Sequence, residues 1–82
     1  MVKTVKRSPT FNKKTKQFDR GQLKILNKLI KKILDNPKVG KPMSYERKGT
    51  RETYFKPFQL SYEFDERHDT LVFLNVYHKK RQ

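Results

Sequence analysis

The sequence predicts an α+β fold in which an N-terminal strand and a helical hairpin precede a three-stranded antiparallel meander, with one sheet packed on the helices. In the first half of the chain, apolar residues recur three and four positions apart, which is the period of an amphipathic helix. In the second half they alternate with polar residues, which is the period of a half-buried strand. With 82 residues the chain is too short for two independent cores, so we expect a single domain over residues 1–82.

Local signals place the first elements. Residues 2–7 are expected to form a short strand at the edge of the sheet. Ser8 followed by Pro9 predicts a helix start, because Ser is a favoured N-cap and Pro is tolerated at the first helical position. The spacing of Asp19 and Gln22 predicts a capping box at the start of a second helix.

The second helix should bury one apolar stripe and expose its lysines. The stripe consists of Leu23, Leu26, Ile30 and Ile33, and it is widened by Ile25, Leu29 and Leu34. The lysines that fall largely off this stripe are Lys24, Lys28, Lys31 and Lys32. The dipeptide Asn36-Pro37 should end the helix, because a residue that precedes proline is disfavoured in helical conformation.

The rest of the chain predicts strands and turns. Residues 38–49 contain two glycines and a proline and are expected to form a loop. Residues 50–55 are expected to form a strand, and the alternation over residues 58–65 predicts a second, half-buried one. A polar turn at 65–69 then leads to residues 71–77, whose nearly continuous apolar sequence predicts a central strand covered on one face by the helices.

The charge of the chain limits the choice of partners. There are 21 Lys and Arg against 8 Asp and Glu, a formal net charge of +13. Such a field suits a polyanion, and nucleic acid is the first candidate because each neutralised phosphate releases counterions. An acidic protein would be attracted by the same field, and a merely solvated lysine-rich surface is the remaining alternative.

Two absences further limit the kinds of protein that this chain can be. No cysteine is present, which excludes disulfides, a thiolate nucleophile and cysteine-based metal sites. The longest apolar run is LVFL, so we expect a cytoplasmic protein without a membrane partner.

The sequence also lacks the usual motifs of several enzyme classes. It has no glycine-rich phosphate loop, no histidine pair at metal-binding spacing and no recognisable Ser/His/Asp set, and its acidic residues are few and scattered. An enzyme built from it would therefore depend on basic residues, without a metal or another cofactor. Metal-independent RNA cleavage is compatible with this, since it needs a base for the 2′-hydroxyl, cations for the phosphorane and an acid for the leaving oxygen.

Basic residues around the end of the last strand are the candidates for this chemistry. His78 titrates near neutrality and suits either proton role, and Lys79 follows it directly. In an antiparallel meander they would lie near cations that border the same concave face, namely Lys48, Arg51 and Lys56. Tyrosine rings offer stacking surfaces for bases, and these are Tyr54, Tyr62 and Tyr77.

Each candidate has a simpler alternative. His78 could end a strand at a solvated edge, and residues 79–81 could form a polar tail. Arg51 could pair with a nearby glutamate and serve only to hold a loop. His68, in a polar turn, is expected to have a surface role, and Tyr62 is expected to be a core ring because it alternates with apolar residues.

The order of elements, with the segments DNPKVGKP and KGTRETYFKPFQLSYEFDERHDTLVFLNVYHKKRQ, resembles the RelE/ParE superfamily of toxins from type II toxin–antitoxin systems. The resemblance covers nearly the whole chain. It implies a RelE/ParE-like fold and a cognate antitoxin, whose extended segment wraps the helices and sheet of the toxin in a hetero-oligomer. In the RelE branch the toxin binds and cleaves messenger RNA on the ribosome, and in the ParE branch the same scaffold poisons DNA gyrase without the nuclease residues.

Within this resemblance, Phe58-Gln59-Leu60-Ser61-Tyr62 matches the "yR-x-x-Y" strand of the family, and His78-Lys79 matches the basic pair that ends the last strand. The implied catalytic residues are His78, Lys79, Arg51 and Gln59. The implied RNA-binding residues are Lys48, Lys56, Tyr54, Lys80 and Arg81. Gln59 stands where the pattern has arginine, and the chain ends at Gln82 before the short C-terminal segment with a tyrosine, so we expect weakened cleavage.

We therefore expect a toxin that acts as a ribosome-dependent messenger RNA endoribonuclease, inhibits translation and is neutralised by its antitoxin. A gyrase-poisoning toxin without nuclease activity and a non-toxic basic RNA-binding protein are the alternatives. Exposed Leu and Ile on the helical hairpin would hold an antitoxin helix in an apolar groove, with acidic residues on that partner offsetting the positive charge.

Overall fold

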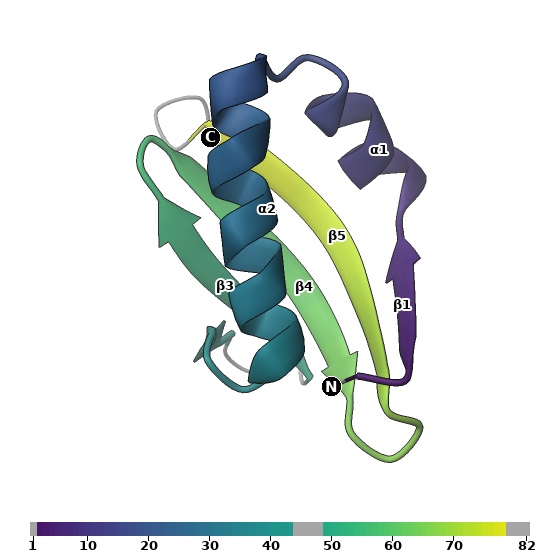
Figure 1. Ribbon diagram of the computed structural model, residues 1–82. Helices are drawn as coiled ribbons and strands as arrows, with labels where there is room; N and C mark the ends of the chain where they lie inside the picture. The colour runs from purple at the N-terminus through teal and green to yellow at the C-terminus, as the bar shows by residue number, and fades with distance from the viewer. Residues whose placement is uncertain (1, 44–48, 79–82) are drawn as a thin grey trace.

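The computed structural model describes residues 2–43 and 49–78 and has the α+β architecture that the sequence predicts (Figure 1). In chain order the elements are β1 (Thr4–Arg7), α1 (Pro9–Thr15), α2 (Arg20–Asp35), β2 (Lys41–Pro42), β3 (Thr50–Phe55), β4 (Phe58–Asp65) and β5 (Thr70–His78). Among the described residues, the strands form one five-stranded sheet in the order β1-β5-β4-β3-β2. Neither described helix combines the length and the apolar content that a bilayer span requires.

The sheet is mixed. The strands β2 to β5 pair antiparallel with their neighbours, whereas β1 pairs parallel with β5, so that Thr4 lies opposite Thr70 and Arg7 opposite Phe73. The last strand therefore lies between β1 and β4, as its apolar sequence predicts, and β1 occupies the expected edge.

Both helices begin where their capping residues predict. The Ser8 hydroxyl accepts a hydrogen bond from the backbone N–H of Phe11 (3.0 Å), and Pro9 is the first residue of α1. Asp19 and Gln22 form the expected capping box at the start of α2, with reciprocal bonds of 2.7 and 2.9 Å. Asn36 caps the C-terminal end of α2, as the Asn36-Pro37 dipeptide predicts.

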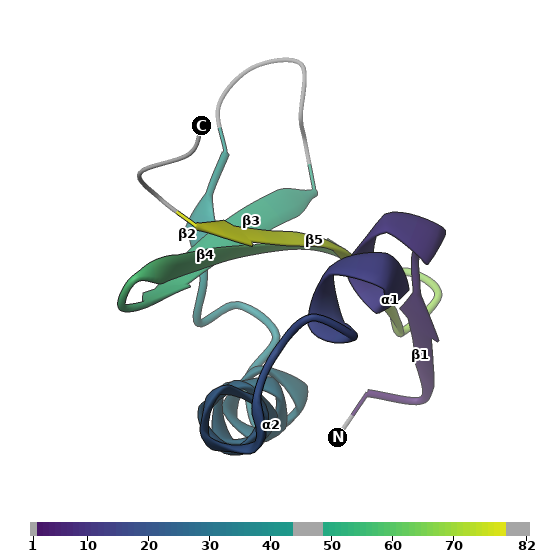
Figure 2. The same cartoon turned by 90° about the horizontal axis from the view of Figure 1, so that it is seen from above.

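Both described helices lie over one face of the sheet, and no described helix lies over the other face (Figure 2). Phe11 of α1 stacks on Phe73 of β5, with 5.3 Å between the ring centroids. The stripe of α2 contributes Leu26, Ile30 and Ile33 to the core, and Leu29 packs against it. The core thus lies between the helices and one face of the sheet.

Two sequence-based expectations about these elements were wrong. Ile25, which was expected to widen the buried stripe, is 51% exposed, because it lies on the solvent side of α2. The segment 38–49 was expected to be a loop throughout, but it contains β2, which pairs Lys41 with Glu52 and Pro42 with Arg51 of β3. A strand of two residues has no periodicity of its own and exists only through this pairing.

A bulge in β5 decides which side chains face the helices. Tyr62 of β4 lies opposite Phe73, but the preceding Ser61 lies opposite Asn75, so Leu74 is an extra residue in β5. One extra residue reverses the alternation of everything that follows it. In consequence Val76 points into the core and Tyr77 points to the helix-free face of the sheet, which we call the open face.

Candidate nucleic-acid interface

Three side chains from three adjacent strands meet on the open face. Gln59 of β4 lies opposite Tyr54 of β3 on one side and opposite Tyr77 of β5 on the other. The neighbouring residues Phe55, Leu60 and Val76 belong to the core, so alternation along each strand turns these three side chains away from the helices. Gln59 is only 5% exposed, whereas Tyr54 is 47% exposed.

A carboxylate joins this group. The side-chain amide of Gln59 donates to Oε2 of Glu52, and the hydroxyl of Tyr54 donates to Oε1 of the same residue at 3.2 Å. Desolvation, followed by the neighbouring Glu52 carboxylate, raises the pKa of the Tyr54 phenol, which therefore stays protonated and a donor at neutral pH. We refer to Glu52, Tyr54, Gln59 and Tyr77 as the open-face cluster.

Glu52 was not among the residues singled out in the sequence. Its signal was available, because it lies two positions before Tyr54 on a predicted strand and must share a face with it.

Arg51 points to the other face, where it holds the segment after α2. Its guanidinium donates to the backbone carbonyls of Lys38 (3.1 Å) and Gly40 (2.7 Å). The simpler alternative, that Arg51 holds a loop, therefore describes its contacts, although its partners are carbonyl oxygens rather than glutamates. The structure does not bring Arg51 to the open-face cluster.

His78 also lies on the helix side, because of the bulge in β5. Its ring makes an edge contact with Phe58, with 5.6 Å between the centroids. Both residues line an open cleft of about 270 Å³ between the end of β5 and the connection of α1 to α2. The other residues that line this cleft are Lys14, Gln17, Phe18, Gln22, Val76 and Tyr77. His78 and Gln59 thus occupy neighbouring strand ends but opposite faces of the sheet.

The cations proposed from the sequence are only partly described. Lys56 is exposed in the turn between β3 and β4, at the end of β4 where the open-face cluster lies. The other proposed cations, Lys48, Lys79, Lys80 and Arg81, lie outside the described residues. Within the described residues, no group of three or more His, Cys, Asp or Glu side chains is arranged to hold a metal ion.

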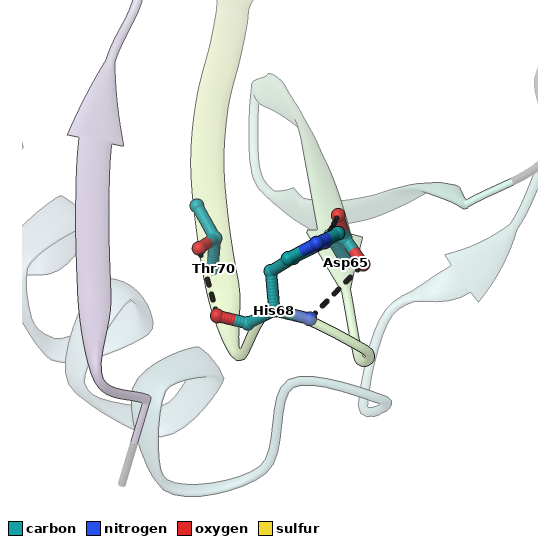
Figure 3. Close-up of polar contacts among 3 residues, drawn as sticks. All are labelled: Asp65, His68 and Thr70. Atoms are coloured by element: carbon teal, nitrogen blue, oxygen red, sulfur yellow. Dashed lines mark hydrogen bonds and ion pairs between the residues drawn. The ribbon is translucent and has the colours of Figure 1, made fainter.

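His68 has a structural partner in the β4–β5 turn (Figure 3). Its ring Nδ1 lies 2.7 Å from Oδ2 of Asp65, its backbone N–H donates to Oδ1 of Asp65, and its carbonyl accepts from the hydroxyl of Thr70. The hydrogen bond from His68 lowers the pKa of the Asp65 carboxyl. His68 is exposed, and the surface role expected for it is confirmed.

The sequence matches no protein-family model, and it matches none of the curated proteins. Solved structures match over nearly the whole chain. The RelBE2 toxin–antitoxin complex from Mycobacterium tuberculosis is similar at 26% identity and a TM-score of 0.78, covering 95% of this chain and 99% of that one.

Two further structures are similar. The isolated RelE toxin of E. coli matches with a TM-score of 0.82 at 12% identity, covering 96% of this chain and 86% of that one. A metal-bound toxin from Helicobacter pylori matches with a TM-score of 0.74 at 25% identity, covering 99% of this chain and 98% of that one.

Proposed function

The chain has the fold of the RelE-type toxins, and from this premise we propose that it is the toxin of a type II toxin–antitoxin pair. We propose more specifically that it cleaves messenger RNA on the ribosome and thereby stops translation. The observation that carries the proposal is the match to the toxin–antitoxin structure from Mycobacterium tuberculosis over almost the full length of both chains.

The open face is the RNA-binding surface in this proposal. No described helix covers it, it displays Tyr54 of β3 and Tyr77 of β5 on either side of β4, and Lys56 lies in the turn beside it. Aromatic side chains on an open sheet stack single-stranded bases and each contributes about 1–3 kcal/mol. The net charge of +13 supplies the attraction for the phosphates.

The catalytic roles that we propose follow from the face of the sheet on which each residue lies. Gln59 can donate to or accept from an RNA oxygen but brings no charge, so we propose that it positions the RNA rather than stabilising the phosphorane. His78 and Lys79 are the proposed proton donor and cation, reached where the RNA passes over the end of β5. Arg51 acts as a positioning residue, through the carbonyls that it holds.

The antitoxin is proposed to bind the helix side. Ile25 is an exposed apolar side chain on α2, and exposed lysines surround it at positions 24, 28 and 32. An amphipathic segment with one apolar anchor and several acidic residues complements this surface. Neutralisation would then combine charge compensation with coverage of an apolar spot.

A gyrase-directed toxin without nuclease activity is the second candidate. One observation favours it: Gln59 occupies the position where the RelE pattern has arginine, and its amide is bonded to the Glu52 carboxylate. This arrangement puts a negative charge where a nuclease of that pattern needs a positive one.

The two candidates predict different molecular damage. The chain is expressed from an inducible promoter in a bacterium, and RNA ends are sequenced after brief induction while plasmid supercoiling is measured in the same cells. Cleavage is expected within translated messages and should disappear when ribosomes are kept from initiating. Intact messages at a growth-inhibiting dose would contradict the nuclease, and a loss of supercoiling in those cells would support the gyrase-directed toxin.

Matched variants sharpen this experiment. His78→Ala and Gln59→Ala should reduce cleavage, whereas Lys24→Ala on the solvent side of α2 should not change it. Co-expression of a small acidic protein from a neighbouring reading frame should restore growth. Unchanged growth after induction of the wild-type chain would contradict both toxin candidates.

A further inference from the structure

The position of Glu52 has a consequence for the RNA that the open face prefers. In a chain of net charge +13, an acid on a phosphate-binding surface repels the backbone that the surface has to hold. Its carboxylate is nevertheless held in place by two donors, the Gln59 amide and the Tyr54 hydroxyl. A fixed acceptor beside the Tyr54 ring suits the edge of a base rather than a phosphate.

The carboxylate retains capacity for a ligand. An ionised carboxylate offers about four lone-pair sites, and the two bonds to Gln59 and Tyr54 occupy one site on each oxygen. Both oxygens can therefore accept one further hydrogen bond, and together they match a pair of adjacent donors. The geometry is the same as that of bidentate pairing between a carboxylate and a planar donor group.

Among the four RNA bases, guanine alone presents two adjacent donors, N1–H and N2–H, on its Watson–Crick edge. Adenine and cytosine offer one amino donor beside an acceptor, and uracil offers one imino donor between two acceptors. Bases in single strands expose this edge while their faces stack on aromatic rings. Tyr54 and Tyr77 lie opposite Gln59, one on each side of it, and supply those rings.

We propose that the open-face cluster selects guanine in single-stranded RNA, with the base stacked on the Tyr54–Tyr77 pair and its two donors bonded to Glu52. This inference rests on the proposed function only in taking RNA as the ligand. It assigns Glu52 as a specificity-determining residue and makes no use of cleavage.

The test is equilibrium binding of the full chain to short oligouridine strands that carry one central substitution. The strand with a central guanosine should bind at least about tenfold more tightly than the strands with a central uridine or adenosine, as expected for a good bidentate base contact. Inosine, which lacks the N2 amino group, and 2-aminopurine, which lacks the N1 proton, should each lose most of this preference. Equal affinity for guanosine, inosine and adenosine overturns the inference, as does the absence of measurable binding.

Variants test the residue itself. Glu52→Gln should abolish the guanosine preference and leave the affinity for plain oligouridine unchanged or higher, because it removes the negative charge. Glu63→Gln is the matched control, since Glu63 is exposed, alternates with the core residue Tyr62 onto the same face, and carries the same charge. An unchanged preference in folded Glu52→Gln overturns the inference, and the base analogues test it even when that variant does not fold.

The two proposals fail in different experiments. Cleaved messages in cells with no guanosine preference in vitro would leave the proposed function standing and overturn this inference. Intact messages together with a preference that depends on Glu52 would overturn the nuclease and sustain the guanine site.

Discussion

Tyr62 is the residue through which the sheet holds the chain segment that follows α2. Its ring is fully buried, as expected for a core tyrosine. Its hydroxyl donates to the carbonyl of Pro37 (2.8 Å) and accepts from the N–H of Gly40 (2.9 Å). Together with the bonds from Arg51, these contacts give residues 37–40 their position, and that segment then supplies β2 to the sheet edge.

Gly40 is required because there is no room for a side chain at this position, and not because of its backbone conformation. A Cβ at this position would lie 2.6 Å from the Tyr62 hydroxyl oxygen and 2.9 Å from a ring carbon. We expect Gly40→Ala to lower the free energy of unfolding by about 1–3 kcal/mol, because the buried ring has no room to move. Urea denaturation followed by circular dichroism measures this.

The control for that substitution is Gly21→Ala in the first turn of α2. A Cβ there meets only the Asp19 carboxylate oxygen at 3.4 Å, an ordinary contact. Because alanine is the better helix former by about 1 kcal/mol, this variant should be as stable as the wild type or more stable. Equal stability of the two alanine variants would contradict the packing argument.

Removing the Tyr62 hydroxyl should have a cost that depends on pH. Tyr62→Phe leaves the buried Gly40 N–H and the Pro37 carbonyl without that partner, so we expect a loss of about 1–3 kcal/mol near neutral pH. Burial raises the pKa of Tyr62 above its usual value in spite of opposing contributions from Gly40 and Arg51. Its stabilisation is therefore fully present below about pH 10 and is lost as the pH rises through the higher folded-state pKa.

Denaturation of the wild type and of Tyr62→Phe in parallel, from neutral pH to well above 10, checks both statements. The difference in the free energy of unfolding between the two proteins should be constant at neutral pH and should shrink at the alkaline end. A difference that grows with pH would show that the sign is wrong.

At the scale of elements, Ser8 joins α1 to the bulge of β5. Its hydroxyl caps α1 and also donates to the carbonyl of Leu74 (2.5 Å), the extra residue of the bulge. Its backbone N–H donates to the carbonyl of Phe73 (2.9 Å). A bulge leaves backbone groups outside the regular ladder, and Ser8 satisfies one of them.

Ser8→Ala should therefore cost more than a helix cap alone. Loss of an N-cap hydroxyl lowers stability by about 0.5–2 kcal/mol, and we expect the upper part of this range because the Leu74 carbonyl loses its partner too. The control is Thr10→Ala, an exposed position of the same helix, which should change stability by no more than about 0.5 kcal/mol. Thermal unfolding measures both, and equal effects of the two substitutions would remove the link between α1 and the bulge.

At the scale of the whole molecule, charge is unevenly distributed. Half of the acidic residues of the chain lie at or near the β4–β5 turn, namely Glu63, Asp65, Glu66 and Asp69. Lys56 and the open-face cluster lie toward the opposite end of β4, and exposed lysines line α2. This polarity orients a polyanion away from the acidic turn.

Lys56→Ala should lower the affinity for single-stranded RNA and should make this affinity less dependent on salt. If Lys56 neutralises one phosphate, the slope of log K against log salt becomes shallower by about 0.7. Lys24→Ala removes the same charge from the helix side and should leave the slope unchanged. Binding titrations at several salt concentrations decide this, and equal slopes for both variants would place the RNA elsewhere.

Much of the fold could be predicted from local signals. Ser8 and the Asp19–Gln22 pair act on the backbone next to them, so their sequence predicts the helix starts directly. The boundaries of β3 and β4 are those expected, and for β4 they follow from the alternation of the sequence, because a sheet with one buried face requires that alternation. Of the predicted helix stripe, Leu26, Ile30 and Ile33 are buried and Leu29 and Leu34 pack against the core, whereas Leu23 is not part of it and Ile25 is exposed; the helical period alone does not show where the buried face ends.

The candidate site was less predictable, because its composition depends on the bulge at Leu74. Simple alternation from Leu71 would turn Tyr77 toward the helices and His78 toward the open face. The extra residue reverses both, placing His78 against Phe58 and Tyr77 beside Gln59. No local feature of this apolar strand predicts the bulge. It is stabilised by Ser8, which lies sixty-six positions away in the sequence.

The sequence by itself determined the kinds of element, their order, the core stripe and the strong positive charge, because periodicity, capping and ionisation are properties of neighbouring residues. Only the tertiary structure decided the parallel pairing of β1 with β5, the short strand β2 and the face on which each candidate side chain lies. These depend on contacts between distant segments: the register of β3 and β4 brings Glu52 and Tyr54 to Gln59, and one extra residue in β5 adds Tyr77 to them while turning His78 away.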